Sequence, residues 1–171
     1  IMPMPLPLIL ASSSPFRRGL MENAGLRFEA VAAEIDERAI EAPLEQQGAT
    51  PDQVALVLAE AKALDVSRRF PGAVVLGSDQ TMSLGARVYH KPKDRREAAE
   101  NLLSLAGRTH QLNSAIVLAR DSEILIREVA HARLTMRAFT AEFVEAYLDR
   151  VGETIFRSVG GYQLEGEGIQ L

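Results

Sequence analysis

The chain has 171 residues, with 19 Lys or Arg against 23 Asp or Glu, so its formal net charge is −4 at pH 7. This length, together with hydrophobic and charged fractions of 47% and 25%, predicts one folded, soluble domain spanning residues 1–171 and excludes a disordered chain. The absence of cysteine excludes disulfides and thiolate metal sites, and the mildly acidic charge disfavours a nucleic-acid polymer as partner. No run approaches the ~18–20 apolar residues of a transmembrane helix and no basic segment precedes the apolar start, so we expect a cytoplasmic protein without a membrane partner.

The first half of the chain alternates short apolar runs with amphipathic segments. Ser14 and Pro15 are typical of an N-cap and the first residue of a helix, and Gly25 is typical of its end. A second helix begins at the capping box formed by Thr50 and Gln53. In chain order we expect a strand at 6–11, a helix from Pro15 to Gly25, a strand at 28–32, an acidic loop, a helix at 51–68 and a strand at 73–76.

The second half contains a long alternating hairpin. Asp121-Ser122 is turn-like and separates two segments of alternating polarity, while Asp94 and Glu97 cap a helix that Gly107 ends. In chain order we expect a ribbon at 81–90, a helix from Asp94 to Gly107, hairpin strands at 111–119 and 124–136, a helix at 140–150 and a strand at 168–171. These elements predict an α/β fold in which a mixed β-sheet is flanked by helices.

The segment 12–18 combines hydroxyls and guanidinium groups where a buried strand turns into a helix. Free amides at a helix N-terminus, the hydroxyls of Ser12 and Ser14, and the charges of Arg17 and Arg18 can together hold an anion such as phosphate. The alternative is an ordinary N-cap followed by two solvated arginines. The chain contains neither a Walker loop nor a Gly-x-Gly-x-x-Gly motif, so the usual signatures of nucleotide binding are absent.

Carboxylates follow two of the expected strands. Glu34 comes after the strand at 28–32, and Asp79 is expected at the C-terminal end of the strand at 73–76. At such an edge an α/β protein can hold Mg²⁺ or Mn²⁺ against a substrate phosphate. A solvated acidic loop is the alternative, and it is favoured for Glu37 and Glu41, whereas an unpaired carboxylate directly after an apolar strand would be costly.

Three further positions could contribute to a site only if they converge on one pocket. Lys62 lies at the edge of the apolar face of the helix at 51–68, and Lys91 follows the ribbon at 81–90; each alone is typical of a surface lysine. Glu165 lies in the glycine-rich segment 160–168, where close backbone approach could let it face a ligand. A glycine-rich turn without a ligand is equally compatible with that segment.

Taken together, these segments resemble the Maf family of nucleoside triphosphate pyrophosphatases, over almost the whole chain. The resemblance implies a fold like that of inosine triphosphate pyrophosphatases, a Mg²⁺ or Mn²⁺ requirement, and cleavage of a nucleotide to its monophosphate and pyrophosphate. It implies that Asp79 is the catalytic acid and that cations and hydroxyls bind the phosphates. The matching segments are 8–18, 34–37, Glu60-Ala61-Lys62-Ala63, Gly77-Ser78-Asp79-Gln80, Lys91-Pro92, 106–110 and 161–168; the phosphate-binding residues are Ser12, Ser14, Arg17, Arg18, Lys62 and Lys91.

Three residues bear on the choice of nucleotide. Phe16 before the arginines, Gln80 after Asp79, and Glu165 look like the 7-methyl-GTP pyrophosphatase subgroup, which implies a house-cleaning enzyme. Two alternatives stay open: a dTTP/UTP pyrophosphatase of the same family, and a nucleotide-binding regulator of cell division that does not hydrolyse its ligand. The resemblance also suggests a homodimer, and the chain is expected to lack the family's C-terminal segment. Whether Asp79 acts as metal ligand, proton acceptor or both stays open at this stage.

Overall fold

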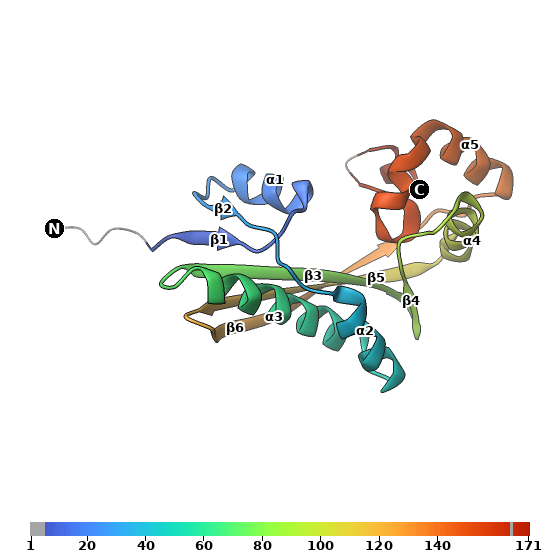
Figure 1. Ribbon diagram of the computed structural model, residues 1–171. Helices are drawn as coiled ribbons and strands as arrows, with labels where there is room; N and C mark the ends of the chain where they lie inside the picture. The colour runs from blue at the N-terminus through green and yellow to red at the C-terminus, as the bar shows by residue number, and fades with distance from the viewer. Residues whose placement is uncertain (1–5, 165) are drawn as a thin grey trace. The chain divides into compact units, whose positions relative to one another are not determined.

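The computed structural model describes residues 6–164 and 166–171, and it confirms a mixed β-sheet flanked by helices (Figure 1). The sheet order is β2-β1-β3-β5-β6, with β4 paired to β3; β1 is parallel to β2 and β3, and β4 is antiparallel to β3. The strands are β1 (Leu8–Leu10), β2 (Glu29–Ala30), β3 (Val74–Leu84), β4 (Arg87–Tyr89), β5 (Thr109–Arg120) and β6 (Glu123–Thr135). The helices are α1 (Pro15–Asn23), α2 (Glu37–Gln46), α3 (Pro51–Arg69), α4 (Arg95–Leu105) and α5 (Ala141–Val151), followed by the 3₁₀ turns η1 (Gly152–Arg157), η2 (Val159–Gly161) and η3 (Glu167–Gln170).

The local signals for helix starts and for the hairpin turn are confirmed. The Thr50 hydroxyl accepts a hydrogen bond from the Gln53 amide at 3.2 Å, and the Gln53 side chain accepts one from the Thr50 amide at 2.8 Å, which completes the capping box. Asp121 and Ser122 have φ angles of +49° and +65°, the left-handed pair that a tight hairpin turn requires. These motifs form as expected because each depends on residues close together in the sequence.

Three expectations about elements are wrong. The strand expected at 73–76 continues to Leu84, so Asp79 lies within β3 rather than at a strand end. The acidic loop contains α2, whose N-cap Asp36 accepts a hydrogen bond from the Ala39 amide at 3.0 Å. The strand expected at 168–171 is the 3₁₀ turn η3, because its amides bond to carbonyls three residues earlier, as Leu171 does to Gly168 at 3.2 Å.

The described residues fall into two compact units, and β3, β5 and β6 contribute residues to both. The first unit contains 6–80 and 114–130. Its core packs small side chains of α3 against residues of β1, β3 and β5; α3 is drawn along β3 in Figure 1. Gly77 permits this close packing, since a methyl group there would overlap the Ala59 carbonyl oxygen and lie 2.8 Å from Ala63 Cβ. The chain therefore brings α3 against β3 just before Asp79.

The second unit contains 81–113 and 131–171, apart from residue 165. Its core is formed by side chains of α4, α5 and η1 together with Met82 of β3 and Tyr89 of β4. The Tyr147 hydroxyl donates to the Gly161 carbonyl at 3.1 Å, and the Tyr162 hydroxyl lies 2.5 Å from His110 Nε2. Gly160 has a φ of +81° and no room for a side chain beside Met82, so its glycine serves packing. In the part of the chain that the structure describes, no helix is long and apolar enough to cross a bilayer.

Candidate functional site

The centre of the candidate site is a buried ion pair between α3 and β3. Lys62 Nζ donates a hydrogen bond to Asp79 Oδ1 at 2.7 Å, and each residue is only 8% exposed. Asp79 shares one face of β3 with Val75 and Gly77, which is the buried face against α3. The mid-strand position of Asp79 therefore brings its carboxylate to Lys62.

The pKa of Asp79 is raised above its usual value. Burial is the main cause, because it penalises the charged carboxylate, and Lys62 and then Arg17 oppose the shift through their positive charges. A buried carboxylate whose pKa is shifted upward beside a fixed cation is typical of a functional position.

Glu37, the first residue of α2, is a second carboxylate at this centre. Its Oε1 lies 2.8 Å from Lys62 Nζ, and its side chain is 54% exposed. The sequence favoured a solvated loop for Glu37, and that interpretation is wrong, because α2 begins where this side chain meets α3. The available signal was local: Asp36 is a good N-cap, and Ile40 and Leu44 have helical spacing.

The expected anion-binding segment lies beside the ion pair. The Leu10 position of β1 pairs with Leu76 of β3, and the Ala11 amide bonds to the Leu76 carbonyl at 2.8 Å, so the residues after β1 run next to those that precede Asp79. Ser12 is buried and its hydroxyl accepts a hydrogen bond from the Ser14 amide at 3.0 Å. The positive charge of Arg17 acts on Asp79 and opposes the rise in the pKa of that carboxylate.

Ser14 is also the N-cap of α1. Its hydroxyl accepts a hydrogen bond from the Arg17 amide at 3.4 Å. The N-terminus of α1, where Ser14 accepts hydrogen bonds from the Arg17 and Arg18 amides, thus begins next to the strand that carries Asp79.

Arg18, Phe16 and Gln80 do not contact the ion pair. Arg18 Nε donates to Glu22 Oε1 at 3.0 Å on the surface of α1, and Phe16 is 43% exposed. Gln80 follows Asp79 and so lies on the opposite face of β3, where its Oε1 accepts a hydrogen bond from the Ser114 hydroxyl at 2.9 Å. The roles expected for these residues stay predictions.

Glu34, the expected metal ligand, contacts α3 at a different point from Glu37. Its side chain is 78% exposed, and its Oε1 lies 3.7 Å from an Arg69 guanidinium nitrogen. Glu37 therefore shares Lys62 with Asp79, whereas Glu34 is paired with Arg69.

Two expected site residues remain, Lys91 and Glu165. Lys91 is exposed and follows β4, and Glu165 lies outside the described residues. Their predicted roles in binding phosphate and base stay predictions.

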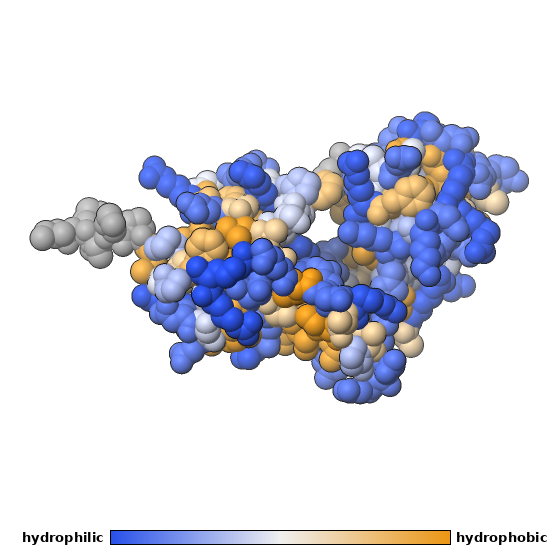
Figure 2. Space-filling view, viewed as in Figure 1, coloured by the Kyte–Doolittle hydropathy of each residue, from blue (hydrophilic) through white to orange (hydrophobic). Residues whose placement is uncertain are grey.

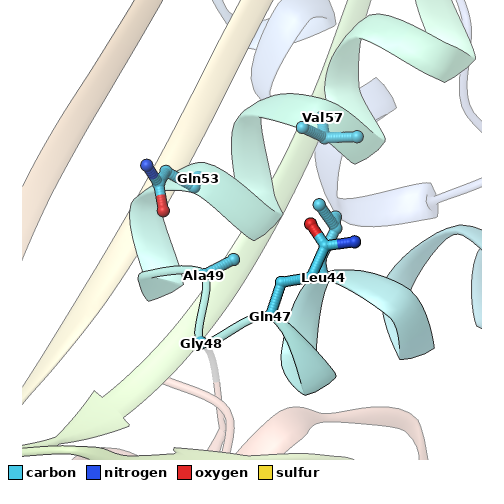
Figure 3. A pocket seen from close by; sticks show the side chains of 6 residues that line it. All are labelled: Leu44, Gln47, Gly48, Ala49, Gln53 and Val57. Carbon is cyan, nitrogen blue, oxygen red and sulfur yellow. The ribbon is translucent and has the colours of Figure 1, made fainter.

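A pocket of about 310 Å³ lies between the end of α2 and the start of α3 (Figure 3). Figure 2 shows apolar residues among hydrophilic ones on the surface of these helices. The lining residues are Leu44, Gln47, Gly48, Ala49, Gln53 and Val57. None of them carries a charge, and none is an expected site residue, so this pocket lacks the groups that would hold a phosphate.

The carboxylates of Asp79 and Glu37 suit a hard divalent cation. Both approach one ammonium group, at 2.7 Å and 2.8 Å, so the structure already directs oxygen ligands toward a positive charge. Oxygen donors of this kind are preferred by Mg²⁺ and Mn²⁺.

Comparisons with known proteins agree with the fold and the motifs. A family model described as Maf-like protein matches residues 7–171. The chain is 68% identical to the 7-methyl-GTP pyrophosphatase of Rhizobium etli over 96% of this chain and 82% of that protein. It is 51% identical to the nucleoside triphosphate pyrophosphatase of Rhodopseudomonas palustris, over 98% of this chain and 82% of that protein. Among solved structures, a HAM1 protein from Coxiella burnetii matches with a TM-score of 0.51 at 15% identity, over 75% of this chain and 71% of that one, which supports the fold.

Proposed function

Since the chain belongs to the Maf-like protein family, we propose that it is a hydrolase that cleaves a nucleoside triphosphate to the monophosphate and pyrophosphate. The observation that carries this proposal is the buried Lys62–Asp79 pair, with Glu37 in contact with Lys62 and the charge of Arg17 acting on Asp79. A site for nucleotide binding alone needs cations against the phosphates, and a buried carboxylate among them would weaken that binding. Hydrolysis, in contrast, requires a group that can accept a proton from water, and the carboxylate of Asp79 can serve in that role.

The substrate that we propose is 7-methyl-GTP. Relatives from Rhizobium etli and Rhizobium meliloti, 68% and 64% identical to this chain, are named 7-methyl-GTP pyrophosphatase. The chemistry expected of Glu165 agrees, since the Watson–Crick edge of 7-methylguanine presents two neighbouring donors and a carboxylate has two acceptor oxygens. Phe16 could stack on the cationic ring with a gain of about 0.5–2 kcal/mol. Uracil would present acceptors to the same carboxylate and bind worse.

In the proposed reaction, water adds to the α-phosphorus, the bond from that phosphorus to the bridging oxygen breaks, and pyrophosphate leaves. Lys62 holds Asp79 Oδ1, and we assign the other carboxylate oxygen to the reacting end, where it accepts the proton of the attacking water. Burial raises the pKa of Asp79, which makes it a better proton acceptor than an exposed aspartate.

Arg17 and the N-terminus of α1 supply positive charge for the phosphates. A triphosphate carries about four negative charges, and fixed cations that face the transferring group stabilise the charge that develops on it. Asp79 and Glu37 would hold the divalent ion, which supplies further charge compensation when bound.

Pyrophosphate release across a panel of nucleotides tests the proposal. We expect the highest kcat/KM for 7-methyl-GTP, compared with GTP, UTP and dTTP, with Mg²⁺ or Mn²⁺ present and a loss of activity in excess chelator. A preference for UTP or dTTP would move the chain to the other substrate class. Tight binding of every nucleotide without pyrophosphate release would contradict the enzymatic function and favour a regulator.

Two related expectations accompany this function. A 7-methyl-GTP pyrophosphatase meets its substrate where nucleotides are made and degraded, so a cytoplasmic location is expected, and a homodimer is the expected assembly. Sedimentation of the purified chain would test the latter.

A further inference from the structure

The face of α3 that carries Lys62 continues into a second cluster of charged groups. Lys62, Asp65 and Arg69 are three and four residues apart in turn, a spacing that places them along one side of the helix. Lys62 binds Asp79 and Glu37, so the first of these residues belongs to the site already described. The other two bind the chain just before Glu37.

Three contacts join Asp65 and Arg69 to the segment between β2 and α2, and a fourth joins the two residues to each other. Asp65 Oδ2 accepts a hydrogen bond from the Glu34 amide at 2.9 Å. Arg69 donates to the Ala32 carbonyl at 2.9 Å and to Asp65 Oδ2 at 2.8 Å, and its other terminal nitrogen lies 3.7 Å from the Glu34 carboxylate. We call Asp65 and Arg69 with their contacts to 32–34 the α3 clamp.

The α3 clamp restrains the position from which α2 starts. The segment 32–37 lies along α3, with its beginning at Arg69 and its end at Lys62. These two helix positions are seven residues apart, about 10 Å at the rise of an α-helix. Without the α3 clamp, the N-cap at Asp36, the packing of α2 and the ion pair with Lys62 itself would be left to determine where the half-exposed Glu37 side chain lies.

The electrostatics of Asp65 fit a restraining role. The pKa of Asp65 is held below its usual value, first by the hydrogen bond from the Glu34 amide and then by Arg69. Its carboxylate therefore stays charged through the neutral range and keeps both contacts.

We propose that Asp65 and Arg69 are positioning residues for Glu37: they fix the segment 32–34 on α3 so that the Glu37 carboxylate meets Lys62 beside Asp79. This inference rests on the proposed function for its effect on turnover. Neither residue touches the Lys62–Asp79 pair in any contact that the structure gives, so their influence passes through the backbone before Glu37.

A double-mutant cycle on turnover tests the proposal. Asp65→Ala should lower kcat for pyrophosphate release by about tenfold, because displacing a site residue by around 1 Å can cost up to ~100-fold. In a Glu37→Gln background the same Asp65→Ala change should have less than a twofold effect, since the group being positioned is already disabled. Asp65→Asn, which keeps an acceptor for the Glu34 amide, should restore most of the activity.

A matched control and a second readout separate this role from general stability. Glu100→Ala breaks an exposed pair with Arg96 at 2.7 Å, four residues apart on α4, and should leave kcat unchanged. Amide hydrogen exchange should show faster exchange at 34 and at 37–40 in Asp65→Ala, with the exchange of α3 unchanged.

The outcomes distinguish the two proposals. An equal loss of kcat in both backgrounds, or parent-like exchange at 34 and 37–40, would overturn the positioning role. A parent that releases no pyrophosphate from any nucleotide would remove the proposed function, while faster exchange confined to those amides in Asp65→Ala would still support the α3 clamp.

Discussion

Replacing Lys62 by Met should destabilise the fold strongly at neutral pH. Lys62 and Asp79 are both 8% exposed and are joined at 2.7 Å. Coulomb's law gives an attraction of roughly 6 kcal/mol between two unit charges at this distance, for an effective dielectric constant of about 20. Removing one partner of a buried pair typically costs about 3–5 kcal/mol, because the other charge is left without compensation. We therefore expect the free energy of unfolding to fall by about 3 kcal/mol or more.

The loss should depend on pH in a defined direction. Burial raises the pKa of Asp79 above its usual 3.8, and Lys62 opposes that rise, so Lys62→Met raises the pKa further. The folded state of the variant then binds a proton more readily than the unfolded state does. The contribution of this protonation to stability is fully present below the unfolded-state pKa of Asp79 and is lost as the pH rises through its folded-state pKa. The free energy of unfolding of the variant should therefore be lower at pH 8 than at pH 5.

Urea denaturation at both pH values measures this effect. The double variant Lys62→Met with Asp79→Asn removes both charges and should recover much of the lost stability at pH 8. Lys93→Met, at an exposed position, serves as the control and should change the free energy of unfolding by less than about 0.5 kcal/mol. A Lys62→Met variant within about 1 kcal/mol of the parent at pH 8 would refute the assignment of a desolvated pair.

Three further experiments test other parts of the structure. Arg17→Ala should raise KM or lower kcat by about tenfold, because it removes a positive charge that binds the phosphates. Arg18→Ala should have a smaller effect on the same constants. Steady-state kinetics compare the two variants, and equal effects would contradict the different placement of the two side chains. Glu165→Gln should narrow the ratio of kcat/KM for 7-methyl-GTP over GTP, and an unchanged ratio would remove Glu165 from base recognition. Gly77→Ala should lower the free energy of unfolding by about 1–3 kcal/mol because the new methyl group overlaps the backbone of α3; a parent-like thermal melt would be evidence against that close packing.

Features that depend on neighbouring residues were predictable from the sequence. The Ser14 and Thr50 caps and the Asp121-Ser122 turn each need only a few residues of the chain, and all are present. The mixed α/β sheet followed from the same alternation of apolar runs. The glycine at position 77 caused the misplaced strand end, since it reads as a turn signal, whereas here it allows α3 to approach β3.

The arrangement of the site was harder to predict from the sequence, because ion pairs between residues far apart in the chain leave no local sequence pattern. Lys62 and Asp79 were both recognised as candidates, through the family resemblance and through the cost of a carboxylate after an apolar run. Glu37 was assigned to solvent because its partner lies 25 positions away in α3. Glu34 carries the same side chain three residues earlier but meets Arg69 of α3 instead of Lys62, because the segment before α2 lies along α3.

Pyrophosphate release from 7-methyl-GTP by the parent chain and by Asp79→Asn tests the central claim, that the buried pair of Lys62 and Asp79 is where hydrolysis occurs. Both proteins are assayed with the same divalent ion, after circular dichroism has shown that the variant is folded. We expect kcat to fall by on the order of 10²-fold or more, the usual contribution of a general base. Parent-like turnover by a folded Asp79→Asn variant would contradict the claim and place the reaction elsewhere in the chain.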